Sequence, residues 1–169
     1  MCAYRFGGYK KDEETIESLW ESNMDRLDPR IPLDLNDTEW RIYSRNPVMP
    51  PHIVAKGATI QNSLAAEGCN VYGTVDFSEL FAGVYVAPGA VVRDSIIMPG
   101  SRIEEGATVQ YAIVAENSVV GANSVVGQRP EDMENKEDWG VAVIGPGCTL
   151  APDTVVPPKA MIDAEEVEK

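Results

Sequence analysis

Aliphatic residues recur about every sixth position along much of the chain, and a small residue stands four positions after each of them. The stretch DSIIMPGSRIEEGATVQYAIVAENSVVGANSVVG, residues 94–127, shows the pattern clearly. Gly or Asn stands at the third position and Ala or Ser at the fourth after Val86, Ile97, Ile103, Val114 and Val120. An amphipathic helix repeats about every 3.6 residues and a strand about every two, so neither element gives this spacing.

Hexapeptide spacing predicts a parallel β-helix, in which three short strands form one triangular coil of about 18 residues. The aliphatic residue points into the narrow prism, a small residue fits the corner, and Gly, Asn or Asp turns the chain at positive φ. A 17-residue period, marked by Ser78, Ser95 and Ala112, overlies the short one. The alternative is a β-sandwich with regular turns, whose strands alternate with period two. We expect about six coils, with these side chains pointing inward: Leu64, Ile97, Ile103, Val114, Val120, Ile144 and Val156.

The hexad repeat is interrupted once, at residues 128–142, where QRPEDMENKEDWG is polar and charged. Such a segment predicts a surface loop that projects from the prism. The sequence therefore divides into residues 1–52, which hold a helix and a linker, and residues 53–169, which hold the β-helix.

Residues 15–27 follow a helical period, because Ile16, Leu19, Trp20, Met24 and Leu27 share one face. The apolar stripe needs a partner, which is either the side of the β-helix or a domain outside this chain. The Pro-rich residues 28–53 predict an extended linker, with anchors at Trp40, Ile42 and Tyr43.

Composition excludes several classes of function. Fourteen Lys and Arg against 27 Asp and Glu give a net charge of −13, and no basic patch for nucleic acid is visible. No apolar run is long enough to span a bilayer, and nothing resembles a signal peptide, so we expect a cytoplasmic protein. Cys2, Cys69 and Cys148 are widely spaced, and one histidine gives no zinc framework, so the cysteines are expected to be core residues.

Several segments carry a resemblance to a known family. They are TIESLWESNMDRLDPRIPLDL and WRIYSRNPVMPP, followed by NSLAAEGC, LFAGV, SIIMPGS and AIVAENSVVG. Together they resemble the C-terminal part of bacterial glucose-1-phosphate adenylyltransferase, or ADP-glucose pyrophosphorylase, from about Gly8 to Ile162. The resemblance implies a left-handed, single-stranded parallel β-helix, which is a mainly β fold.

The resemblance also implies a function. In that family a nucleotidyltransferase domain converts ATP and glucose 1-phosphate to ADP-glucose and pyrophosphate with Mg²⁺, in glycogen biosynthesis. Its β-helix domain supports allosteric regulation and tetramer contacts. This sequence lacks the Gly-rich nucleotide loop, so we expect an excised domain or a truncated reading frame that is inactive alone and binds no cofactor. The implied partners are the missing nucleotidyltransferase domain, further copies of the chain and a phosphorylated sugar effector. The alternatives are a stand-alone hexapeptide acyltransferase and a non-enzymatic scaffold.

One active-site motif of the family reaches this chain, at Tyr9-Lys10-Lys11-Asp12-Glu13-Glu14-Thr15. The family motif reads aromatic, Trp, any residue, Asp, Val, Gly, Thr, with the Asp near Mg²⁺ and the substrate phosphates. Asp12 and Thr15 match, so the resemblance makes Asp12 the candidate catalytic and metal-binding residue. Lys10 replaces the Trp, and Glu13 and Glu14 add carboxylates that repel phosphates. The competing interpretation is a solvated acidic start of the helix.

The remaining candidates are cations and one histidine. An effector or anion site could form from these cations: Arg45, Lys56, Arg93, Arg102, Arg129 and Lys159. Lys159 stands at a corner position otherwise held by Gly, Asn or Asp, so it either serves function or caps the last coil. His52 is the base that an acyltransferase would need, but it precedes the regular coils, and a surface or packing role is favoured.

Overall fold

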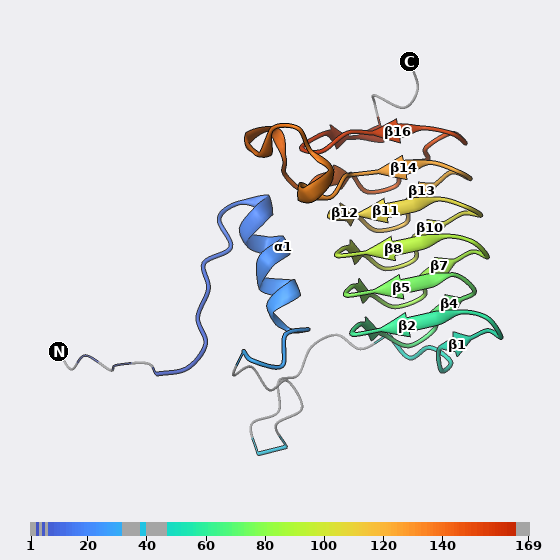
Figure 1. Ribbon diagram of the computed structural model, residues 1–169. Coiled ribbons are helices and arrows are strands. Elements are labelled where there is room, and N and C mark those ends of the chain that lie inside the picture. Colours follow the sequence, from blue (N-terminus) through green and yellow to red (C-terminus); the bar gives the residue numbers. More distant parts are fainter. Residues whose placement is uncertain (1–2, 4, 6, 32–37, 40–46, 165–169) are drawn as a thin grey trace.

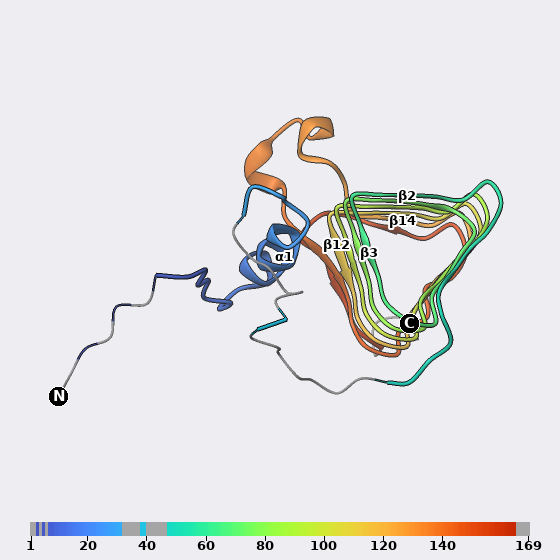
Figure 2. The same cartoon turned by 90° about the horizontal axis from the view of Figure 1, so that it is seen from below.

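A computed structural model describes residues 3, 5, 7–31, 38–39 and 47–164. The described chain forms one α-helix and a parallel β-helix of six coils, stacked one above the other (Figure 1). Viewed along the stack, the coils superpose as a triangle, with the helix outside one of its sides (Figure 2). The expected left-handed parallel β-helix of about six coils is confirmed, and the β-sandwich is excluded because every strand pair is parallel.

Each side of the triangle is one parallel sheet, and each coil adds one strand to each sheet. Sheet A contains β1 (Ile53–Val54), β4 (Asn70–Val71), β7 (Tyr85–Val86), β10 (Arg102–Ile103) and β13 (Val119–Val120), and an isolated bridge at Thr149 continues it. Sheet B contains β2 (Thr59–Gln61), β5 (Thr74–Asp76), β8 (Val91–Arg93), β11 (Thr108–Gln110), β14 (Val125–Val126) and β16 (Val155–Val156). Sheet C contains β3 (Leu64–Ala65), β6 (Glu79–Leu80), β9 (Ile96–Ile97), β12 (Ala112–Val114), β15 (Ala142–Ile144) and β17 (Met161–Ile162).

The core fills the prism with stacked aliphatic side chains, one per strand. Six of the seven residues expected to point inward are at most 2% exposed: Ile97, Ile103, Val114, Val120, Ile144 and Val156. Leu64 is the exception, with 43% of its surface exposed. Its neighbour Ala65 pairs with the buried Leu80 and takes the inward position. The prediction for Leu64 is therefore wrong by one residue, because the inward residue of that strand is too small to stand out as an aliphatic position.

The corner from sheet B to sheet C is tighter than the other two. Between β8 and β9 only Asp94 and Ser95 intervene, and Phe77, Asp94 and Tyr111 occupy the equivalent turn position in successive coils with φ of 43°, 46° and 48°. This short corner makes the usual repeat 17 residues from coil to coil, rather than about 18. One repeat is 15 residues, because only Tyr72 and Gly73 separate β4 from β5 at the corner from sheet A to sheet B. Positive φ is costly for bulky residues such as Phe and Tyr, so the packing around this corner must hold them in place.

A ladder of serine hydroxyls satisfies the backbone behind this corner. Ser95 Oγ donates to the Arg93 carbonyl at 2.6 Å and accepts from the Ala112 N–H of the next coil at 3.2 Å. Ser78 makes the equivalent pair of bonds with Asp76 and Ser95. Small hydroxyl residues suit the corner because they fit and also satisfy polar backbone groups that are buried there.

Helix α1 (Ile16–Asp25) covers the outer face of sheet C. Thr15 caps its N-terminus in a capping box with Ser18, and Pro29 follows its end. Its apolar stripe packs on the outward residues of sheet C and its corner, including Ile96, Ile113 and Phe77. The partner left open by the sequence is therefore the side of the β-helix, and the expected helix is confirmed.

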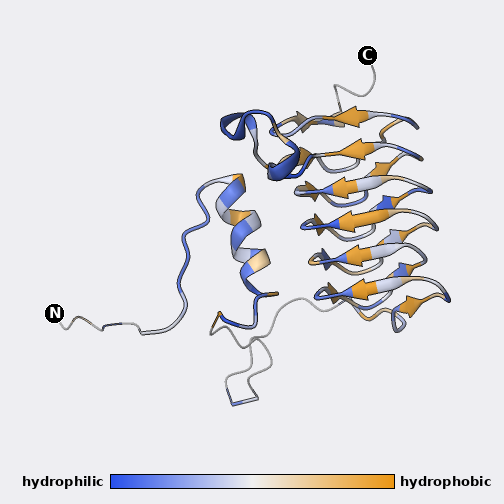
Figure 3. Ribbon diagram, in the orientation of Figure 1, coloured by the Kyte–Doolittle hydropathy of each residue, from blue (hydrophilic) through white to orange (hydrophobic). Residues whose placement is uncertain are grey.

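Residues 127–141 link β14 to β15 and carry two short 3-10 helices, η1 (Pro130–Asp132) and η2 (Lys136–Asp138). The segment is hydrophilic and lies beyond the N-terminal end of α1 (Figure 3). The sequence placed its break in the repeat at residues 128–142, and in the structure β15 begins at Ala142. The segment does more than project into solvent, however, because its Trp139 is only half-exposed and contacts α1.

Candidate functional site

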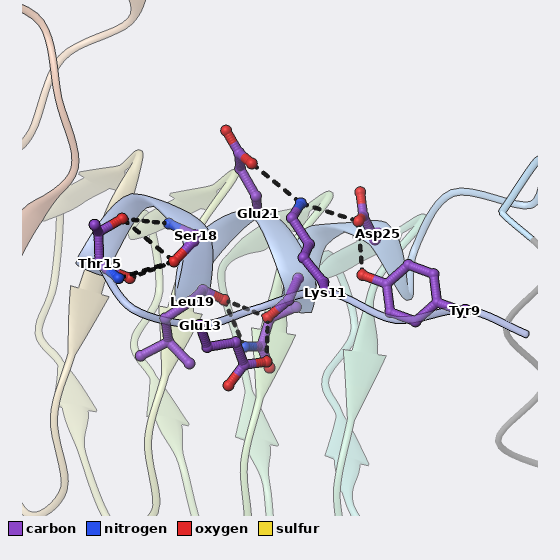
Figure 4. Close-up of polar contacts among 10 residues, drawn as sticks. Tyr9, Lys11, Glu13, Thr15, Ser18, Leu19, Glu21 and Asp25 are labelled. Atoms are coloured by element: carbon purple, nitrogen blue, oxygen red, sulfur yellow. Dashed lines mark hydrogen bonds and ion pairs between the residues drawn. The ribbon is translucent and has the colours of Figure 1, made fainter. Parts of the chain in front are cut away.

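Asp12, the candidate carried over from the family motif, stands between Lys11 and Glu13, which lie in a segment that runs alongside α1 (Figure 4). Its neighbours fasten this segment. Tyr9 donates its hydroxyl to Asp25 at 2.8 Å, and Lys11 forms ion pairs with Glu21 and Asp25, both at 3.1 Å. The Ser22 hydroxyl donates to Glu13 at 2.6 Å, and Thr15 is the helix cap. Tyr9, Lys11, Glu13 and Thr15 of the motif therefore hold the segment in place.

The surroundings of Asp12 do not fit a magnesium site. Its side chain is 71% exposed, and its charge is paired with Lys10 at 3.4 Å. Within the described ranges, no group of three or more His, Cys, Asp or Glu is arranged to hold a metal ion. Mg²⁺ needs several oxygen ligands around one point, and a single exposed carboxylate paired with a lysine does not supply them.

The candidate cations are spread over the prism instead of converging. Lys56 is an exposed residue of the first coil, and Arg102 lies on sheet A, where it pairs with Glu104 at 3.0 Å and stacks over Tyr85 at 4.2 Å. Arg93 lies on sheet B, in register with Asp76, and its Nε is buried without a hydrogen-bond partner in the described structure. Arg45 lies outside the described residues, as do Cys2 and the linker anchors Trp40, Ile42 and Tyr43.

Two of the candidate cations, Arg129 and Lys159, belong to or contact the 127–141 segment. Arg129 precedes η1 within residues 127–141, and Lys159 reaches that segment from the last coil by donating its Nζ to the carbonyl of Glu137. Lys159 has φ of 61°, so it occupies the left-handed corner position that the sequence assigned to it. In the described structure this lysine ties the 127–141 segment to the final coil.

Among the described residues, His52, Cys69 and Cys148 show no arrangement for nucleophilic or acid–base chemistry. His52 is exposed just before β1, whereas Cys69 and Cys148 are buried at prism corners. Burial raises the pKa of both thiols, which keeps them protonated and unreactive. The expectation that cysteines are core residues is confirmed for these two.

Three aromatic rings from distant parts of the sequence meet where α1, the sheet B–C corner and the 127–141 segment come together. Trp20 lies 5.6 Å from Tyr111 and 6.4 Å from Trp139, and Tyr111 lies 5.4 Å from Trp139, measured between ring centroids. Trp20 Nε1 donates to the carbonyl of Asp94 at 2.7 Å, and Trp139 Nε1 donates to the carbonyl of Gln128 at 2.9 Å. We call Trp20, Tyr111 and Trp139 the aromatic clasp.

Acidic groups surround the aromatic clasp. Burial raises the pKa of Asp94 to about 6, and the charges of Asp76 and Glu131 add to the rise. Burial likewise raises the pKa of Tyr111 to about 12, assisted by Asp94 and Glu131. The clasp therefore repels anions, and it holds elements together without presenting a site for a phosphorylated ligand.

An ion pair with a buried carboxylate fastens the C-terminal end of α1. Arg26, the C-cap residue, places Nη1 3.1 Å from Oε2 of Glu79 on sheet C. Glu79 is 2% exposed, and burial raises its pKa while the charge of Arg26 opposes the rise. The sequence did not single out this pair, because Glu79 stands at an outward position of a strand, where a charged residue ordinarily indicates solvent.

The outward corner between sheets A and B forms an open groove of about 390 Å³, lined by Gly89, Gly106, Asn123 and Glu105 among others. Its only charged lining residue is a carboxylate, so it does not suit an anionic effector. No helix within the described ranges is both long and apolar enough to cross a membrane.

Comparisons with known proteins agree with this geometry. A family model described as "GlmU-like, C-terminal hexapeptide" matches residues 50–144. The chain is 54% identical over 102 residues to "Glucose-1-phosphate adenylyltransferase" of Clostridium perfringens (strain SM101 / Type A), covering 60% of this chain and 26% of the relative. It is 50% identical over 102 residues to the protein of the same name from Bacillus thuringiensis (strain Al Hakam), covering 60% and 27%. The chain thus spans about a quarter of the length of the curated relatives that it matches.

Proposed function

Since the chain belongs to the family of GlmU-like C-terminal hexapeptide domains, we propose that it is the β-helix domain of a glucose-1-phosphate adenylyltransferase. Its role there is to support assembly and to couple effector binding to catalysis. The observation that carries this proposal is the 54% identity over 102 residues to a protein of that name. A stack of six coils with flat outer faces suits assembly, because each face presents a regular surface to a partner.

Catalysis itself belongs to a nucleotidyltransferase domain that uses ATP, glucose 1-phosphate and Mg²⁺. Adenylyl transfer needs a cradle for phosphates, cations that offset developing charge and carboxylates that hold the metal. The exposed Asp12 beside Lys10 supplies none of these alone. The chain is therefore proposed to need that domain as its partner.

Helix α1 supports the proposed coupling. The aromatic clasp holds the middle of α1 on the prism, and the Arg26–Glu79 pair holds its C-terminal end. A domain joined to the segment before α1 would therefore be connected to the β-helix through two anchored points. The proposal includes a phosphorylated sugar effector. Arg129, which lies in the 127–141 segment, and Lys159, which contacts that segment, are the cations proposed to bind it.

The test measures adenylyl transfer first by the chain alone and then by the chain mixed with a separate nucleotidyltransferase domain. The pure chain is mixed with ATP, glucose 1-phosphate and Mg²⁺, and pyrophosphate release is measured; we expect turnover at the level of the buffer blank. The assay is then repeated with a Clostridium perfringens relative that lacks its last quarter. We expect the chain to raise the turnover of that truncated enzyme, because the β-helix restores its assembly.

Three results would contradict the proposal. Turnover by the chain alone, lost on Asp12→Ala, would show a catalytic site that the exposed Asp12 does not suggest. Saturable binding of acetyl-CoA in titration calorimetry, lost on His52→Ala, would favour the stand-alone acyltransferase. A failure of the chain to change the truncated enzyme in any way would favour a non-enzymatic scaffold.

A further inference from the structure

A methionine side chain lies against the first two corners from sheet C to sheet A. A Cβ on Gly68 would lie 2.9 Å from Met49 Cε and 3.0 Å from Met49 Sδ, and a Cβ on Gly83 would lie 3.1 Å from Met49 Cε. Packed carbon atoms ordinarily approach to about 3.5–4.0 Å. The thioether of Met49 therefore rests directly on bare glycine backbone, in space that a side chain at position 68 would need.

Met49 belongs to residues 47–52, which lead into β1 and which we call the linker end. The Gly68 N–H donates to the carbonyl of Pro50 at 2.7 Å, so a backbone hydrogen bond joins the linker end to the same corner. Val48 is 96% exposed, whereas Met49 is 38% exposed. Met49 is therefore the apolar anchor of the linker end.

Exposure and packing coincide at Met49. Because 38% of this residue is exposed, hydrogen peroxide, a molecule little larger than water, can reach it. Met24, which packs beneath α1, is only 5% exposed and is shielded. Met161 is 58% exposed on β17, in the last coil and far from the linker end. Oxidation of Met49 would thus change a contact that neither of these other methionines makes.

Hydrogen peroxide converts a methionine thioether to a sulfoxide in a single two-electron step. The sulfur attacks one peroxide oxygen, a sulfur–oxygen bond forms and the oxygen–oxygen bond breaks. The proton of the transferred oxygen passes to the departing hydroxide, which leaves as water. The sulfur is oxidised, the peroxide is reduced, and an apolar side chain becomes a polar one.

The two glycines cannot satisfy the new oxygen. The Gly68 N–H is already used by Pro50, and the Gly83 N–H donates to the carbonyl of Glu67 at 3.0 Å. A polar atom that is packed away from water without a partner is costly, so the sulfoxide must turn toward solvent. We propose that Met49 is an oxidation site, and that its conversion to the sulfoxide by hydrogen peroxide releases the linker end from the β-helix.

The test treats the full 169-residue chain with hydrogen peroxide, locates the sulfoxides by peptide mass spectrometry and follows amide hydrogen exchange by NMR. We expect Met49 and Met161 to be oxidised and Met24 to be protected. Exchange at the Gly68 amide should become at least about tenfold faster, because the carbonyl that accepts from it moves away. The Gly83 amide donates within the prism and should keep its rate. Methionine sulfoxide reductases of both stereospecificities should restore slow exchange at Gly68.

Three variants separate this contact from general oxidative damage. Met49→Leu keeps an apolar side chain of similar volume without sulfur, so Gly68 should exchange slowly with or without peroxide. Met49→Gln places a polar amide over the glycines and should speed exchange at Gly68 without any oxidant. Met161→Leu is the matched control and should leave the response of Gly68 to peroxide intact.

Four results would overturn the proposal. Met49 could remain a thioether while Met161 is oxidised, or Met49 could be oxidised with no faster exchange at Gly68. The response to peroxide could also persist in Met49→Leu, which would place the sensitive group elsewhere. Exchange at Gly68 in Met49→Gln that is as slow as in the wild-type chain would show that the linker end does not need an apolar anchor.

Discussion

Asp94 occupies a left-handed turn at the tight corner of the prism, where its carboxyl is half-buried near Asp76 and Glu131. Its pKa in the folded protein is raised to about 6 from 3.8. Between these two pH values the folded state binds a proton that the unfolded state has released. The free energy of unfolding should therefore fall as the pH rises from about 4 to about 6, and this contribution should be constant above that range.

Asp94→Asn should remove this dependence, because an amide cannot ionise and Asn tolerates positive φ as well as Asp does. At pH 7 we expect it to stabilise the protein by about 1–2 kcal/mol, after discounting the shift for solvent screening. Urea unfolding at pH 4.5 and pH 7 measures the difference. Asp153→Asn is the control, since Asp153 also has positive φ, at 60°, but is exposed. Equal pH dependence in Asp94→Asn and in the wild-type chain would contradict the assignment.

At the scale of single residues, the sequence predicted correctly those turn positions whose residue type, Asn or Asp, itself favours positive φ. Asn117, Asn123 and Asp153 hold the left-handed corner positions that their spacing assigned to them. Leu64 failed because its strand places a small residue inward, and the hexad pattern recognises only large ones. Phe77 and Tyr111 were not identified as turn residues, since tertiary packing overrides the preference of aromatic residues for negative φ.

At the scale of elements, α1 is held on sheet C by its apolar stripe, and Trp20 is the residue that contacts both the corner and the 127–141 segment. Trp20→Ala removes the two ring contacts and the hydrogen bond to Asp94. We expect α1 docking to weaken by about 2–3 kcal/mol, because the indole is only partly buried. Hydrogen exchange should accelerate in α1 and in residues 127–141, while the prism strands keep their protection.

Trp20→Phe is the matched control for this prediction. It retains an aromatic ring against Tyr111 but loses the Nε1 donor, so about 1 kcal/mol should be lost, which is the typical contribution of one hydrogen bond. Faster exchange throughout the prism in Trp20→Ala would show that α1 is required for the fold itself. Unchanged exchange in α1 would show that the aromatic clasp contributes nothing to docking.

The elements themselves could be predicted because each follows from a local period. The helix follows from the stripe of Ile16, Leu19 and Trp20, and the coils follow from the hexads. The docking of α1 could not be predicted, because the outward residues of sheet C, such as Ile96 and Ile113, precede the inward ones directly in sequence. Such apolar pairs are compatible with any covering element, and only the assembled prism shows which element covers them.

At the scale of the whole molecule, the faces of the prism differ in what they leave exposed. Sheet C is covered by α1, so the helix stripe is not the free adhesive surface that an unpartnered helix would offer. Sheet A presents Ile53, with 53% of its surface exposed, and a pair of tyrosine rings, Tyr72 and Tyr85, whose centroids lie 5.6 Å apart. Arg102 stacks over Tyr85. Tyrosine and arginine are the residue types that contribute most at protein interfaces.

We therefore expect the chain to form a symmetric dimer through sheet A, since a two-fold axis pairs one such patch with its own copy. Tyr85→Ala should raise the dimer dissociation constant by at least about tenfold, as removing a central aromatic anchor does. Thr108→Ala, at a similar height of the prism on sheet B, should leave it unchanged. Sedimentation velocity over a range of chain concentrations measures the constant.

Salt provides an independent check on this assembly. Each copy carries a net charge of −13, so two copies repel each other before their faces meet. Raising the ionic strength from about 0.01 M to 0.15 M shortens the Debye length from about 30 Å to about 8 Å, which screens this repulsion. The dimer should consequently tighten with salt, whereas an association driven by opposite charges would weaken. A strictly monomeric mass at high chain concentration and moderate salt would rule out the dimer, and equal effects of Tyr85→Ala and Thr108→Ala would place the interface elsewhere than sheet A.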